Sequence, residues 1–180
     1  MRSYIERDVR QLLEVKDLSL FQKFVRLCAG LSGHLVNYSS LAADCGVSHN
    51  TIRAWISVLE SSYIVHTIPP YHESFTKRLI KAPKLYFYDT GLLCWLLGIH
   101  SIQHLEVHPL WGHIFETFVV SEIRKLLLQH GSPASMYFWR DSGGLEIDLV
   151  VEESGSLLPI EIKAGETLTP DFFTGLSSVT

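Results

Sequence analysis

The sequence predicts an α+β chain in two parts. The first part, about residues 1–100, contains a short helix, a glycine turn and a second helix, followed by two strand-like runs. The second part, residues 101–180, begins with a long helical stretch and continues with three apolar runs separated by DSGG and ESGS turns. A chain of 180 residues with 47% hydrophobic content can bury a substantial core, so we expect both parts to be folded.

Helices come first along the chain. Residues 4–14 have helical periodicity without glycine or proline, and residues 18–33 form a second amphipathic stretch. A short helix then stops at Gly46, and Ser48 caps a longer helix that runs to about Ser61. Because a tight glycine turn joins these two helices, the segment predicts a helix-turn-helix.

The two strand-like runs that follow would form the wing of a winged helix. YIVHTIPPYH (63–72) ends at a proline pair, and KLYFYDT (84–90) ends at a turn. The most concentrated basic stretch of the chain lies between them, and its cations are Lys77, Arg78, Lys81 and Lys84. We expect these cations, together with Arg53 in the second helix of the helix-turn-helix, to contact DNA phosphates. A protein-docking role for the winged helix stays open.

Charge, cysteine spacing and apolar runs limit the classes of protein to which the chain can belong. The formal net charge of −4 means that any contact with nucleic acid depends on a local patch rather than on the overall field. Cys28, Cys45 and Cys94 are too widely spaced for a disulfide framework or a metal knuckle, which predicts reduced thiols in a cytoplasmic protein. The longest apolar run, 92–99, is too short to span a bilayer, and the charged start of the chain does not resemble a signal peptide. We therefore expect a soluble protein without a membrane partner.

The second part begins with a helix over residues 111–130. Its apolar positions recur at helical spacing and predict the buried face; they are Ile114, Phe115, Phe118, Val119 and Ile123. Glu116 lies within this apolar pattern, which favours a specific role, although a solvated or i+4-paired glutamate is the simpler interpretation. Arg140, at the end of the first strand, is expected to meet either a phosphate or Asp141.

Carboxylates alternate along the last two strand-like runs. Successive side chains on a strand face opposite sides, so Glu146 and Asp148 share one face of LEIDLVVE. By the same argument Glu161 and Lys163 share one face of LLPIEIKA. Acidic residues are depleted in strands and costly when buried without a partner, so this pattern predicts a site more than it predicts plain exposed strand faces.

Carboxylates in this pattern predict a site for a hard divalent cation. Mg²⁺ takes carboxylate, carbonyl and water oxygens as ligands, and Asp148 and Glu161 would hold it. Lys163 would orient or deprotonate an attacking water, and Glu116 would complete an outer or second-metal shell. Such a site would hydrolyse phosphodiesters. The chain has no GxxxxGKS/T loop, so we expect no ATP site and no ATPase activity.

Several motifs occur in the order typical of one family. They are YIERDVRQL, VSHNTIRAWISVLESSYIV, KAPKLYFYDTGLL, GHIFETFVVSEI, YFWRDSGGLEIDLVV and PIEIKAG. Together they resemble the C-terminal region of a large family of bacterial and archaeal AAA-type ATPases, a domain of unknown function that follows the ATPase module. The resemblance implies a winged helix followed by a part similar to the PD-(D/E)xK fold of restriction endonucleases and archaeal Holliday-junction resolvases.

The resemblance also implies roles for single residues. Glu116 matches the acid of the helix, Asp148 the metal-binding aspartate, and Glu161 and Lys163 the ExK pair. The fold expected from it is a winged-helix part followed by an α/β restriction-endonuclease-like domain with a short mixed sheet, truncated at its C-terminus. The ATPase module would act in cis or in trans.

The motifs and the resemblance are compatible with two functions, one catalytic and one non-catalytic. The first is a C-terminal, DNA-associated module of an AAA-type ATPase with a nuclease-like, Mg²⁺-dependent phosphodiesterase site. The alternative is a non-catalytic module that docks proteins or DNA, or a remnant fragment, whose nuclease-like fold is vestigial. The sequence leaves a homo-oligomer open in both cases.

Overall fold

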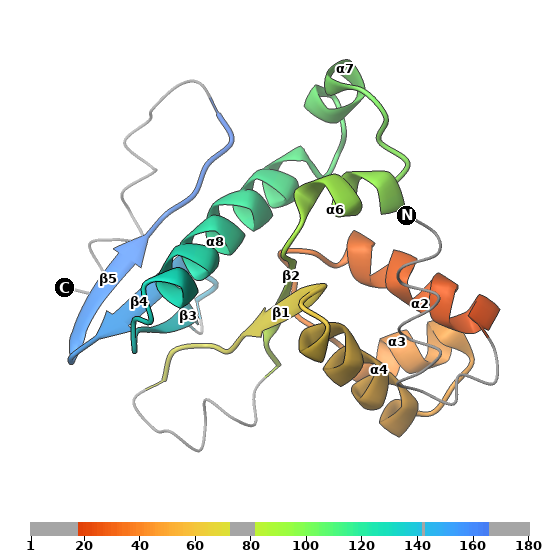
Figure 1. Ribbon diagram of the computed structural model, residues 1–180, viewed down its shortest axis with the longest axis horizontal. Coiled ribbons are helices and arrows are strands. Elements are labelled where there is room, and N and C mark those ends of the chain that lie inside the picture. Colours follow the sequence, from red (N-terminus) through yellow and green to blue (C-terminus); the bar gives the residue numbers. More distant parts are fainter. Residues whose placement is uncertain (1–17, 73–81, 142, 166–180) are drawn as a thin grey trace.

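Helices gather at one end of the molecule and an antiparallel sheet at the other, with a β-hairpin between them (Figure 1). The structure is a computed structural model that describes residues 18–72, 82–141 and 143–165. The helix expected at 4–14 lies outside the described residues. The same holds for the expected DNA contacts Lys77, Arg78 and Lys81.

The helical end contains α2 (Leu18–Gly30), α3 (Tyr38–Cys45) and α4 (His49–Ser61). Gly46 ends α3 with a φ of 72°, a left-handed conformation that favours glycine. The Ser48 side chain caps α4 by accepting a hydrogen bond of 3.1 Å from the Thr51 amide. The predicted pair of helices and the turn between them are therefore confirmed.

The hairpin consists of β1 (Val65–Ile68) and β2 (Lys84–Phe87), which pair antiparallel. The segment 32–36 lies along the other edge of β2: the Gly33 amide donates to the Leu85 carbonyl at 2.8 Å, and the Leu85 amide donates to the His34 carbonyl at 3.1 Å. β2 thus lies between β1 and the segment 32–36, which joins it through isolated bridges. All of its residues are buried, so both of its faces are covered.

The chain continues through α6 (Thr90–Leu96), capped by Asp89, into α7 (Ile102–Glu106) and α8 (Trp111–Gln129). The sequence predicts no helix over the five residues of α7. No helix in the described ranges combines the length and the apolar character needed to cross a membrane.

The sheet at the far end consists of β3 (Ser135–Arg140), β4 (Glu146–Glu153) and β5 (Ser156–Ile160), all antiparallel in the order β3-β4-β5. The expected short mixed sheet is therefore wrong for the described residues. Turns of a few residues join consecutive strands, and such turns can connect only antiparallel neighbours. β5 also ends at Ile160, so Glu161 and Lys163 follow the strand instead of lying on it.

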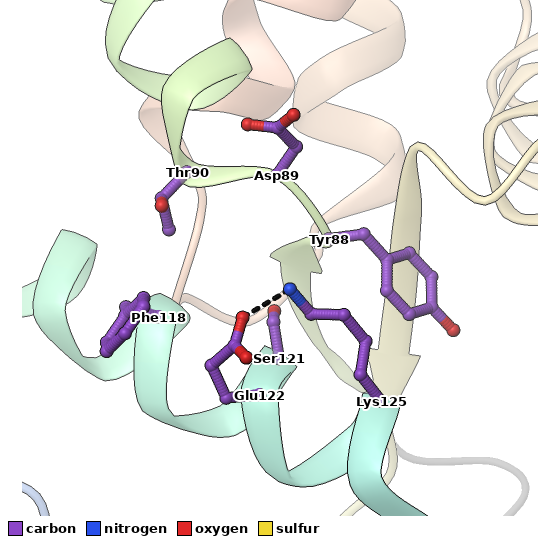
Figure 2. A pocket seen from close by; sticks show the side chains of 7 residues that line it. All are labelled: Tyr88, Asp89, Thr90, Phe118, Ser121, Glu122 and Lys125. Carbon is purple, nitrogen blue, oxygen red and sulfur yellow. Dashed lines mark hydrogen bonds and ion pairs between the residues drawn. The ribbon is translucent and has the colours of Figure 1, made fainter. Parts of the chain in front are cut away.

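The buried face of α8 differs from the predicted one. Its buried residues include Glu116, Thr117 and Ser121, whereas Phe118 is 48% exposed and borders a surface pocket (Figure 2). The polar side chains are buried because they find partners on the hairpin side: Ser121 Oγ donates to the Phe87 carbonyl at 2.7 Å, and Thr117 Oγ1 lies 2.9 Å from Ser32 Oγ. A periodicity of apolar residues alone does not reveal such a face.

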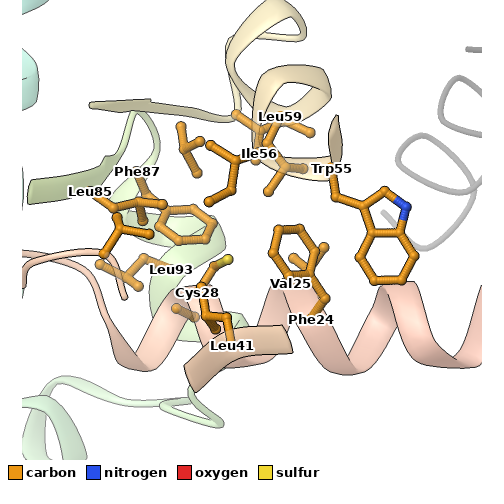
Figure 3. Close-up of a cluster of buried hydrophobic side chains, with 14 of the residues drawn as sticks. Phe24, Val25, Cys28, Leu41, Trp55, Ile56, Leu59, Leu85, Phe87 and Leu93 are labelled. Carbon is orange, nitrogen blue, oxygen red and sulfur yellow. The ribbon is translucent and has the colours of Figure 1, made fainter. Parts of the chain in front are cut away.

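Two hydrophobic clusters meet at β2. The first lies among α2, α3, α4 and α6 and receives Leu85 and Phe87 (Figure 3). The second lies between α8 and the sheet and receives Tyr86, because side chains alternate along the strand. Backbone hydrogen bonds add to this connection, since the Tyr71 amide donates to the Phe138 carbonyl at 2.6 Å. The hairpin therefore contributes to both cores.

Truncating Leu85 tests this central position of β2. Leu85 is fully buried, so we expect Leu85→Ala to lower the free energy of unfolding by about 2–5 kcal/mol. The matched control is Leu158→Ala on β5, where a 60% exposed side chain predicts a change within about 0.5 kcal/mol. Urea denaturation of both variants measures the difference, and equal small losses would contradict the placement of Leu85.

Candidate functional site

Charged side chains converge where β2, α8, β4 and the segment after β5 meet. We call this group the charged cluster. Its members are Lys84, Glu116, Glu146, Asp148, Glu161 and Lys163. Electrostatic contacts link its members, since the charges of both Glu116 and Glu161 act on Asp148.

Lys84 and Glu116 are the buried ion pair of the cluster. Only 4% of Lys84 is exposed, and its Nζ lies 3.0 Å from Glu116 Oε1 and 2.5 Å from Glu146 Oε1. Tyr86, two residues along β2 and therefore on the same face, donates a hydrogen bond of 2.7 Å to Glu116 Oε1. The hairpin thus delivers a cation and a hydroxyl group to a carboxylate of α8.

These contacts keep both partners charged. Burial alone would lower the pKa of Lys84, but the Glu116 and Glu146 carboxylates outweigh it and raise the pKa above its ordinary value. Burial alone would likewise raise the pKa of Glu116, yet His113, Lys84 and Tyr86 together lower it. The result is a buried ion pair, which is costly to form and more costly to break.

Asp148, Glu161 and Lys163 form a second group within the cluster. The Ile162 amide donates to Asp148 Oδ2 at 2.8 Å, and Lys163 Nζ lies 3.8 Å from the same oxygen and pairs with Glu161. Glu161 Oε2 is buried and has no hydrogen-bond partner among the described residues. Burial, with the charges of Glu116 and Glu161 adding to it, raises the pKa of Asp148 to about 6 although the Ile162 amide opposes the shift.

The structure brings together the predicted residues Glu116, Asp148, Glu161 and Lys163. It also contains Glu146, which the sequence places on the same strand face as Asp148 without a ligand role, and it adds Tyr86, to which the sequence assigns no role. The signal for both is the alternation of side chains, which places Tyr86 with Lys84 on β2 and Glu146 with Asp148 on β4.

The remaining predicted residues have separate positions. The sequence predicts Lys84 as a DNA contact, whereas the structure buries its ammonium group between two carboxylates, where a phosphate cannot reach it. Arg53 is exposed on α4, with its guanidinium carbon 5.9 Å from the centre of the Tyr38 ring. Arg140 Nε lies 3.7 Å from Glu146 Oε2, while Asp141 accepts a hydrogen bond from the Leu145 amide.

The carboxylates fit a magnesium ion in type and number. In the described part of the chain, no group of three or more His, Cys, Asp or Glu side chains is arranged to hold a metal ion. Mg²⁺ is, however, usually bound by one or two carboxylates with waters and substrate phosphates completing its shell. Asp148 and Glu161 supply two such carboxylates. Glu161 has a buried oxygen without a hydrogen-bond partner among the described residues, and burial raises the pKa of Asp148, so a cation here would stabilise both carboxylates.

Comparison with known sequences assigns the chain to a family. The Domain of unknown function (DUF8612) matches residues 1–103, more than half of the chain. The chain belongs to the DUF8612 family. In this DUF8612 chain a second family, the Domain of unknown function (DUF4143), matches residues 111–180, which include α8 and the sheet. The two matches divide the chain close to the boundary predicted at residue 100.

Longer proteins resemble the DUF8612 chain over nearly all of its sequence. Uncharacterized proteins of Mycobacterium bovis and of Mycobacterium tuberculosis are each 32% identical to it over 176 residues. These residues make up 98% of the chain but 38% of each relative, so the chain spans well under half the length of the curated relatives it matches. No solved structure matches the chain.

Removing the buried cation tests the ion pairs. We expect Lys84→Met to lower the free energy of unfolding by about 3–5 kcal/mol at pH 7, because Glu116 would be left as a buried charge without its cation. Lys125→Met is the control: Lys125 pairs with Glu122 on the surface of α8, and such a pair contributes about 1 kcal/mol or less. Equal losses of unfolding free energy in the two variants, measured by urea denaturation, would contradict the assignment of Lys84 as a buried ion-pair partner.

Asp148 predicts a pH dependence of stability. Its folded-state pKa of about 6 is above the ordinary value of 3.8, so the folded state binds the proton more tightly than the unfolded state does. The resulting stabilisation is complete below about pH 4 and is lost as the pH rises through 6, with a magnitude on the order of 2–3 kcal/mol. In Asp148→Asn the free energy of unfolding should no longer fall as the pH rises through 6, and the variant should be more stable than the parent at pH 8. Asp44→Asn, an exposed aspartate of α3, should keep the pH dependence of the parent.

Proposed function

We propose that this chain is a DNA-associated module of an AAA-type ATPase and that its charged cluster is a Mg²⁺-dependent phosphodiesterase site. The observation that carries the proposal is the convergence of Glu116, Asp148, Glu161 and Lys163, which come from α8, from β4 and from the segment after β5. A helix acid, a strand aspartate and an ExK pair are also the residues implied by the resemblance to PD-(D/E)xK nucleases.

Each residue has a defined part in this mechanism. Asp148 and Glu161 would hold Mg²⁺, which supplies a Lewis acid and lowers the pKa of a bound water. The Ile162 amide fixes one oxygen of Asp148, so the carboxylate keeps its orientation. Lys163, beside both carboxylates, would orient the attacking water and offset charge on the phosphate. Glu116, held by Lys84 and Tyr86, would act through its charge on Asp148 instead of as a direct ligand.

The DNA-binding part of the proposal has support of its own. α3 and α4 form two helices joined at Gly46, and the hairpin and the segment 32–36 pair along β2. A winged helix is built from these parts, and Arg53 is exposed on α4 for a phosphate contact.

The ATPase part of the proposal rests on the match of residues 111–180 to DUF4143. DUF4143 is a domain found in proteins associated with AAA ATPases. The mycobacterial relatives are also much longer than this chain. We propose that an ATPase module acts with this chain in cis or in trans.

A second candidate is a non-catalytic docking module. The observation that favours it is the ion pairing within the charged cluster, where Lys84 pairs with Glu116 and Glu146 and Lys163 contacts Asp148 and Glu161. Ion pairs of this kind can hold a fold together without any chemistry. This candidate predicts no affinity for Mg²⁺.

Cleavage of linear, supercoiled and branched DNA with Mg²⁺ or Mn²⁺ separates the two candidates. We expect Asp148→Asn and Lys163→Met to lose at least about 100-fold in rate, since each removes a ligand or an orienting charge from the reaction centre. Glu153→Gln, an exposed carboxylate at the end of β4, should cut at the parental rate. Absence of cutting together with absence of Mg²⁺ binding by calorimetry would exclude the phosphodiesterase and favour docking.

A further inference from the structure

A cavity that is separate from the charged cluster lies at the end of α4, where β1 and α8 come close. Its volume is about 350 Å³, which is within the range of about 300–1,000 Å³ typical of small-molecule sites. The side chains that matter for its chemistry are Tyr63, Tyr88, His66 and Arg124. None of them belongs to the charged cluster.

Two of the residues that line this cavity each have a buried nitrogen atom without a hydrogen-bond partner in the described part of the chain. These atoms are Nδ1 of His66 and Nε of Arg124. His66 itself is only 4% exposed. Buried polar groups are almost always hydrogen-bonded, so two unpartnered nitrogens on residues that line one cavity indicate a ligand that would complete them.

The hydrogen bonds of Ser121 define what such a ligand must offer. Ser121 Oγ donates its one proton to the Phe87 carbonyl at 2.7 Å, so it can only accept from His66 Nε2, which is 3.2 Å away. The proton of the neutral imidazole is therefore on Nε2, and Nδ1 carries a lone pair. Burial, with the Arg124 charge adding to it, lowers the pKa of His66 to about 3 and keeps the ring neutral at pH 7. Nδ1 therefore requires a donor, and Arg124 Nε–H requires an acceptor.

The aromatic walls add a preference for a flat ring. The rings of Tyr63 and Tyr88 are 5.9 Å apart, and the His66 ring is 4.7 Å from that of Tyr88. Tyr63 follows α4 with a φ of 53°, a left-handed conformation in which glycine is usual and a bulky residue is strained. It is also 70% exposed, so its ring lies at the solvent side of the cavity. Strain of this kind is concentrated at functional sites.

We propose that this cavity binds a nucleobase. A base has a flat face for Tyr63 and Tyr88, and it carries a donor beside an acceptor on its edge, which matches His66 Nδ1 and Arg124 Nε–H. The base belongs either to a free mononucleotide or to an unpaired position of a DNA strand. The chemistry of recognition is the same for both.

Titration of the intact chain with the four deoxynucleoside monophosphates and with single-stranded decanucleotides tests the proposal. We expect saturable binding, weakened about 5- to 140-fold by Tyr63→Gly, which removes a stacking ring. This substitution suits the backbone at φ 53°, so the thermal midpoint should stay the same or rise while binding falls. Arg124→Gln should weaken binding as well. Lys125→Gln is the control, because Lys125 pairs with Glu122 on a neighbouring pocket (Figure 2).

The outcomes separate the two sources of the base. Binding of mononucleotides that is lost in Tyr63→Gly supports a free nucleotide, and binding of decanucleotides alone with the same loss supports an unpaired base of a strand. No saturable binding of either probe would overturn the proposal. Binding that Tyr63→Gly and Arg124→Gln leave at the level of Lys125→Gln would overturn it as well.

Discussion

The buried ammonium group of Lys84 is the constraint on which the arrangement of the molecule depends. A buried ion costs several kcal/mol unless opposite charges and hydrogen bonds compensate it. Glu116 of α8 and Glu146 of β4 supply these charges, so the hairpin, the helix and the sheet must all meet at this point. The same strand sends Leu85 into the helical core and Tyr86 into the other core. One short strand thus specifies how both parts of the chain are placed.

The charged cluster is also the place where the fold and the proposed chemistry meet. Its four carboxylates face the ammonium groups of Lys84 and Lys163, which leaves an excess of negative charge in a partly buried site. The pKa of Asp148 is raised chiefly by burial and further by the charges of Glu116 and Glu161, while His113, Lys84 and Tyr86 lower the pKa of Glu116 and keep it ionised. A bound cation would relieve this excess. The Mg²⁺ site proposed above would place a cation beside Asp148 and Glu161, where it would stabilise their ionised forms.

Local signals in the sequence predict where helices begin and end. The features that the sequence does not predict depend on contacts between distant segments. The cap at Ser48 and the turn at Gly46 depend on neighbouring residues and are found where expected. The buried polar face of α8 depends on partners in the hairpin, about 30 residues away, which periodicity does not register. The sequence groups Lys84 with its neighbouring cations, whereas the structure pairs it with carboxylates of α8 and β4. Glu161 and Lys163 lie beyond the end of β5, yet they still reach Asp148 because the Ile162 amide ties this segment to it.

The coupling of the two parts through β2 can be measured directly. Hydrogen exchange at the amides of α4 and β4, followed across a urea titration of the intact chain, reports the unfolding of each part separately. If β2 joins the parts as described, α4 and β4 lose protection with the same midpoint and the same free energy of unfolding. Exchange of β4 at low urea while α4 stays protected would contradict this coupling.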